Sequence, residues 1–102
     1  MAAPPPGLPV PDDVSAPVLI YTTPLCGYCR AALALLRARD IEHLQVDVSG
    51  QPQARRWMFE VTQQRTVPQI FVRGRSIGGY TELAQLDQSG QLERLLAGSD
   101  PP

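Results

Sequence analysis

The two cysteines of this 102-residue chain stand three positions apart, between two apolar segments. An apolar run from Val18 to Tyr21 precedes them, and a run rich in alanine and leucine from Ala31 to Ala38 follows them. This pattern predicts that Cys26 lies where a strand passes into a helix. The unpaired N–H groups and the positive dipole end of a helix favour a thiolate over a thiol. The pair therefore requires a fold that joins a strand to a helix start, and it points to sulfur chemistry.

Composition narrows the class of protein further. A hydrophobic content of 43% in a chain of this length predicts one small domain with a modest core. All nine basic residues are arginines, and they are mixed with ten acidic residues, so we expect no face for nucleic acid or for a membrane surface. The apolar runs are too short to span a bilayer. Two cysteines without a secretory signal argue against a disulfide scaffold, and a reducing, cytoplasmic location is expected.

The first seventeen residues differ in composition from the rest. Residues 1–17 hold six of the eleven prolines, and Leu8 is their only bulky aliphatic residue besides valines. We therefore expect a disordered or extended leader, then a folded domain over 18–98 and a short tail over 99–102. A transit peptide would carry arginines, but the first basic residue is Arg30. A proline motif read by some partner is the alternative to a solvated leader.

The spacing of apolar residues predicts alternating strands and helices. Cys29, Leu33 and Leu36 repeat at helical spacing, so Cys29 should face inward while Cys26 lies at the mouth of the helix. Leu44, Val46 and Val48 share one side of a second strand. Pro52 should begin the next helix, Gly74 should allow a hairpin, and Ser89-Gly90 should separate two final helices. The expected strands span 18–21, 43–48, 69–72 and 76–77. The resulting order, βαβα followed by ββα and an extra helix, is the layout of a thioredoxin-like α/β fold with a central four-stranded mixed sheet.

Three segments carry a more specific signal. They read Tyr-Thr-Thr-Pro-Leu-Cys-Gly-Tyr-Cys (21–29), Thr-Val-Pro-Gln-Ile-Phe (66–71) and Gly-Gly-Tyr-Thr-Glu-Leu (78–83). In order and spacing they resemble the signature segments of a dithiol glutaredoxin, and the resemblance covers about 18–98. It implies an enzyme that uses glutathione to reduce glutathione mixed disulfides and protein disulfides. Cys26 would be the nucleophile, and Cys29 would close a redox-active disulfide with it.

The resemblance also implies a groove for glutathione, the reducing cosubstrate. Val67, beside a cis Pro68, would pair through its main chain with the cysteinyl part of glutathione, and Arg55 would hold the glycine carboxylate. The γ-glutamyl end would lie on the helix start near Thr81 and Glu82, where an aspartate is commoner than glutamate. The complete expected set for glutathione is Tyr28, Arg55, Thr66, Val67, Pro68, Gly79, Thr81 and Glu82.

Other functions remain open on the sequence alone. Gly27, where proline is usual, resembles glutaredoxins in which two chains and two glutathiones hold a [2Fe-2S] cluster through the nucleophilic cysteine, here Cys26. That alternative implies a dimer acting in iron–sulfur storage, transfer or sensing, whereas a monomer that meets glutathionylated or disulfide-containing client proteins is expected otherwise. A redoxin that serves another thiol is a further alternative. Half of a zinc site is disfavoured, because His43 is the only other soft or imidazole donor.

Overall fold

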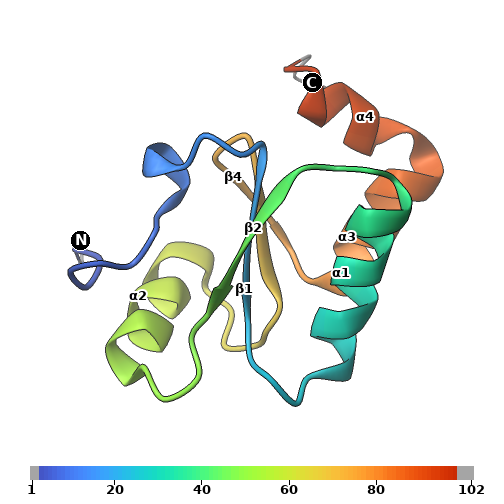
Figure 1. The fold of residues 1–102 in the computed structure, drawn as a ribbon. Coiled ribbons are helices and arrows are strands. Elements are labelled where there is room, and N and C mark those ends of the chain that lie inside the picture. The colour runs from blue at the N-terminus through green and yellow to red at the C-terminus, as the bar shows by residue number, and fades with distance from the viewer. Residues whose placement is uncertain (1–2, 99–102) are drawn as a thin grey trace.

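The computed structural model describes residues 3–98, so the predicted tail over 99–102 lies outside the described residues. Strands and helices alternate in the predicted order (Figure 1). No helix in the described part of the chain is long and apolar enough to cross a membrane. The strands are β1 (Val18–Thr22), β2 (His43–Asp47), β3 (Gln69–Val72) and β4 (Arg75–Gly78). The helices are η1 (Pro11–Asp13), α1 (Gly27–Ala38), α2 (Pro52–Thr62), α3 (Tyr80–Ser89) and α4 (Gln91–Leu96).

The four strands form one mixed sheet in the order β2-β1-β3-β4. β1 runs parallel to β2 and antiparallel to β3, which pairs antiparallel with β4. All five residues of β1 are buried, as expected for a central strand covered on both faces. The predicted four-stranded mixed sheet is confirmed.

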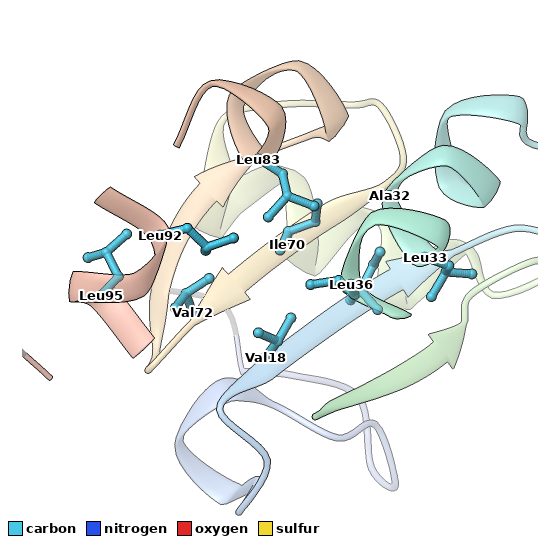
Figure 2. Close-up of a cluster of buried hydrophobic side chains, with 10 residues drawn as sticks. Val18, Ala32, Leu33, Leu36, Ile70, Val72, Leu83, Leu92 and Leu95 are labelled. Carbon is cyan, nitrogen blue, oxygen red and sulfur yellow. The ribbon is translucent and has the colours of Figure 1, made fainter. Parts of the chain in front are cut away.

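Alternate residues of β1 supply two separate hydrophobic clusters. Val18 and Ile20 pack with residues of α1, α3 and α4, whereas Leu19 and Tyr21 pack with α2. Figure 1 shows α2 on one side of the sheet and α1 and α3 on the other, and Figure 2 shows side chains of the first cluster. Each large side chain buried this way contributes about 1.5–3 kcal/mol. The end of β1 that leads into the cysteine pair is therefore held from both faces.

Two turns form at glycines, as the sequence predicts. Arg73 and Gly74 both have positive φ, of 50° and 83°, which is the backbone of a tight turn that fits the twist of two antiparallel strands. Gly90 has a φ of 80° and separates α3 from α4.

The second strand is less buried than its pattern suggests. Val48 is fully buried and Val46 is partly buried, but Leu44, on the same side of the sequence pattern, is 38% exposed. The reason is its place at the edge of the sheet, since helices cover the central strands more completely than the edges. Alternating apolar residues predict which side chains share one face of a strand, but they do not predict how much of that face the helices cover.

The leader, which the sequence predicts to be disordered or extended, packs against the domain over its described residues. Over residues 3–17 it lies on the α2 side of the sheet, where Leu8, Val10 and Val14 pack against the cluster that contains Tyr21 (Figure 1). The buried hydroxyl of Tyr21 donates a hydrogen bond of 2.6 Å to the carbonyl of Pro9. Prolines oppose regular secondary structure, but they do not prevent an extended chain from covering an apolar surface. The leader therefore contributes to the core of the domain that follows it.

The bond between Tyr21 and Pro9 can be tested by stability. Replacing Tyr21 with Phe should lower the free energy of unfolding by about 1 kcal/mol, because it removes one hydrogen bond while keeping the ring in the core. Deleting residues 1–10 should cost more, since it leaves the hydroxyl unpaired and uncovers apolar surface. Urea denaturation measures both changes. In the shortened chain Tyr21→Phe should be neutral or stabilising, and an equal loss in both backgrounds would contradict the role of Pro9.

Candidate active site

Cys26 is the N-cap residue of α1. Its backbone is extended, and its Sγ accepts a hydrogen bond of 3.1 Å from the backbone N–H of Cys29. This is the position where serine or aspartate commonly satisfies a free N–H group at a helix start. The sulfur is partly exposed, so a substrate can reach it. The start of α1 thus presents an accessible sulfur that is hydrogen-bonded to a main-chain N–H group.

Cys29 lies one turn further along and faces the interior. It is 1% exposed, and burial raises the pKa of its thiol to about 12, with its hydrogen bond to Cys26 adding to the effect. Arg55 opposes the shift by favouring the thiolate. Both cysteines are free thiols in this structure. Cys29 therefore remains protonated at neutral pH, close to a more accessible partner.

The main chain before β3 comes directly beside the nucleophile position. The Cys26 thiol lies 3.6 Å from the carbonyl oxygen of Val67 and donates to it. The peptide bond between Val67 and Pro68 is cis, as the resemblance implied. This hydrogen bond brings together two segments that are distant in the sequence, the start of α1 and residues 66–68.

A hollow of about 220 Å³ opens next to this contact, and we call it the trough. Seven of the eight residues expected to bind glutathione line it, and Arg55 is the exception. Gln64 and Tyr80 also line it, although the sequence analysis did not select them. The trough is formed by Tyr28, Gln64, Thr66, Val67, Pro68, Gly79, Tyr80, Thr81 and Glu82.

Glu82 caps the helix that closes one end of the trough. Its Oε1 accepts a hydrogen bond of 2.7 Å from the backbone N–H of Gly79, the N-cap residue of α3. Gly78 makes room for this, because its φ is 101° and a Cβ there would come within 2.7 Å of Glu82 Oε1. Thr81 lies in the first turn of α3, two residues after the N-cap. The carboxylate of Glu82 is thus fixed beside the free N–H groups of α3.

Arg55 lies outside the trough. It lines a neighbouring hollow of about 430 Å³ with Arg56, Arg65, Phe59 and Pro52. The Nη2 atom of Arg55 donates to the carbonyl of Arg65 at 3.0 Å, and the Arg65 guanidinium lies 4.2 Å from the centre of the Phe59 ring. Arg65 was not among the residues predicted to bind glutathione. Its position immediately before Thr66 was the available signal.

Tyr28 and Tyr80 form a stacked pair at the trough. Their ring centres are 6.2 Å apart and their planes differ by 29°. Tyr28 is 67% exposed, whereas Tyr80 is partly buried against the first cluster. Tyr80 therefore connects an exposed ring of α1 to the core through α3. Its place between Gly79 and Thr81 was the signal that the sequence offered.

A larger hollow, of about 770 Å³, lies among β4, α3 and α4, but Val67, the residue whose carbonyl meets the Cys26 thiol, lines the trough and not this hollow. It shares Glu82 with the trough. Among residues 3–98, no three His, Cys, Asp or Glu side chains lie together in a way that could hold a metal ion. The chemistry of the cysteine pair therefore makes the trough the candidate substrate site.

The difference between the two thiols predicts selective alkylation. Native reduced protein treated with iodoacetamide near neutral pH should take up one adduct, on Cys26, because Cys29 is buried and protonated. Peptide mass spectrometry locates the adduct. Cys26→Ser should take up almost none until it is unfolded in urea. A second adduct on the native protein would contradict the assignment.

The raised pKa of Cys29 also predicts a loss of stability in alkali. Folding raises this pKa from its ordinary value of 9.0 to about 12, so the folded state holds the proton more tightly between these values. The stabilisation is complete below about pH 9 and is lost as the pH rises toward 12. Urea denaturation at increasing pH should therefore show a falling free energy of unfolding. Cys29→Ser should show a smaller fall over the same range.

Comparisons with known proteins agree with this geometry. The glutaredoxin family model matches residues 18–77. A glutaredoxin of Neisseria meningitidis serogroup A is 41% identical over 80 residues, which are 78% of this chain and 94% of that one. The solution structure of glutaredoxin from Brucella melitensis matches with a TM-score of 0.75 and 37% identity, over 85% of this chain and 95% of that one. The crystal structure of a buckwheat glutaredoxin-glutathione complex shares the fold, with a TM-score of 0.78 and 24% identity over 83% of this chain and 80% of that one. With its thioredoxin-like fold and paired cysteines, this chain belongs to the glutaredoxin family of thiol-disulfide oxidoreductases.

Proposed function

We propose that this protein reduces glutathione mixed disulfides and protein disulfides, with glutathione as the reductant. The observation that carries the proposal is an accessible sulfur at the start of α1, bordered by a trough that runs from Val67 to Glu82. The fold neighbour from buckwheat is described as a complex with glutathione, which supports the same ligand here. A reducing compartment such as the cytoplasm suits this role.

The trough offers complementary groups for a γ-glutamyl tripeptide. Once Cys26 is a thiolate it no longer donates to Val67, so that carbonyl is free to accept from the amide of the cysteinyl part. The γ-glutamyl carboxylate suits the free N–H groups at the start of α3, and its ammonium group suits the Glu82 carboxylate beside them. Arg55 and Arg65 supply positive charge for the glycine carboxylate.

The reaction with a glutathionylated client begins with attack of the Cys26 thiolate on the glutathione sulfur. A bond forms between these two sulfurs, the original disulfide breaks, and the client leaves as a thiolate that takes a proton from water. The thiolate of a second glutathione then attacks the glutathione sulfur of the mixed disulfide. Oxidised glutathione leaves, and the Cys26 thiolate is regenerated.

Protein disulfides require the second cysteine. Attack of Cys26 on a client disulfide leaves the client bound to the enzyme, and Cys29 must lose its proton to attack the Cys26 sulfur and release it. The product is the Cys26–Cys29 disulfide, which two glutathione molecules reduce while forming one oxidised glutathione. Burial and the high pKa keep Cys29 a thiol until that step.

A pair of serine variants tests these roles. With a glutathionylated peptide, Cys26→Ser should lose activity, whereas Cys29→Ser should keep most of it, because free glutathione can complete the cycle. With a protein disulfide, both variants should be impaired. A coupled assay that follows oxidised glutathione measures each rate. Activity retained in Cys26→Ser would overturn the proposal.

Binding of a [2Fe-2S] cluster is the alternative use of the same sulfur. Such a cluster is held by four thiolates, and within the described residues Cys26 is the one cysteine that is not buried. It could therefore supply one ligand, and a second chain with two glutathiones would supply the others. Visible absorbance of protein purified without oxygen, together with a dimeric mass, would favour this alternative over the reductase.

Glu82 provides a test of glutathione recognition. Glu82→Gln keeps an amide oxygen that can cap Gly79 but removes the charge that suits the γ-glutamyl ammonium. The KM for a glutathionylated peptide should rise roughly three- to tenfold, with little change in kcat. Stability should change by no more than about 0.5 kcal/mol.

The matched control is Glu93→Gln, a charge removal in the first turn of α4 and outside the trough. Its KM should equal that of the wild type. An equal rise in both variants would indicate an effect of net charge and would contradict a local role for Glu82.

A further inference from the structure

Gln69, the first residue of β3, is a polar side chain sealed in the interior. It is 0% exposed, and its Nε2 donates to the carbonyl of Thr66 at 2.9 Å and to Oε1 of Gln64 at 3.0 Å. Its own Oε1 has no hydrogen-bond partner among the described residues. The opposite orientation of the amide would place that oxygen against the Thr66 carbonyl oxygen, so the observed one is favoured.

The two partners of Gln69 belong to the trough. Gln64 and Thr66 both line it, and Thr66 directly precedes Val67, whose carbonyl lies 3.6 Å from the Cys26 sulfur. The segment from 64 to 67 is a loop. Its other hydrogen bonds run from Gln64 N to Thr62 Oγ1, from Arg55 to the Arg65 carbonyl and, while Cys26 is a thiol, from Cys26 to the Val67 carbonyl. Gln69 thus holds the end of the loop that presents main-chain groups to a ligand.

We infer that Gln69 is a positioning residue for the glutathione site. It touches no substrate, but from the core it fixes the Thr66 carbonyl and thereby the direction of the Val67 main chain beside Cys26. This inference rests on the proposed function, because it assigns Gln69 a role in seating the ligand of that trough. A backbone that pairs with a ligand must be held close to its bound geometry for affinity and orientation.

The unpaired Oε1 distinguishes this role from a structural one. A buried acceptor without a partner disfavours the folded state, whereas an apolar side chain of similar size would fill the space without that cost. Gln64 and Thr66 are exposed, so water can take their hydrogen bonds when the amide is removed. Stability alone therefore favours an apolar residue at position 69, and the amide is explained by what it holds in place.

The experiment compares Gln69→Leu and Gln69→Met with the wild type, using a glutathionylated peptide as substrate. We expect the KM to rise about three- to tenfold while kcat changes less than about twofold. The urea midpoint should stay the same or rise. Nuclear magnetic resonance relaxation should show a more mobile backbone at Thr66 and Val67, with β1 unchanged. Two variants of different shape guard against a packing defect in either one.

Gln45→Leu is the matched control. Gln45 lies on β2, at the edge of the sheet away from β3, and its Nε2 donates to Thr22 Oγ1 at 3.3 Å. Its KM should equal that of the wild type. For Gln69→Leu, an unchanged KM with an active wild type would overturn this inference alone, as would a loss of stability without greater backbone mobility at Thr66 and Val67. A wild type inactive toward glutathione substrates would instead overturn the proposed function, and a role in glutathione binding with it.

Discussion

The hydrogen bond from the Cys29 amide to the Cys26 sulfur connects the fold to its chemistry. In most helices a serine or aspartate oxygen fills this place, and here a sulfur does so. The hydrogen bond forms only if α1 begins at Gly27. A helix of 12 residues has only marginal stability by itself. The sheet holds the start of α1 in place, because β1 is buried on both faces and α1 packs back over it.

The two cysteines differ in reactivity because one is partly exposed and the other is buried. Cys26 stands just outside the first turn and meets solvent, whereas Cys29 has entered the helix on its inward face. Burial disfavours a charge on Cys29, whereas Cys26 keeps an accessible sulfur at the helix end. One residue type thus supplies an accessible sulfur and a buried reserve thiol. The division of labour proposed for the reaction depends on this difference.

Periodicity was sufficient to predict the strands, the helices and the inward face of Cys29, because each depends on neighbours along the chain. The segments at 66–71 and 78–83 located most of the trough through their resemblance to the family. Periodicity does not tell which residues, distant in the sequence, a side chain contacts in the folded chain. Tyr80 and Arg65 were missed for that reason, and the placement of Arg55 outside the trough could not be seen. Gln69 lies in a buried strand, and the apolar pattern of that strand does not predict the hydrogen-bond partners of its amide.

The leader is attached to the domain partly through its main chain, and this attachment has a consequence for shortening the chain. Tyr21 binds a main-chain carbonyl, which every amino acid possesses, so the residue at position 9 can change without loss of the bond. The matched family region begins at residue 18, after this contact. Cutting this chain to its matched region would therefore remove Leu8, Val10 and Val14 from the apolar cluster on the α2 side of the sheet and leave the Tyr21 hydroxyl without this acceptor.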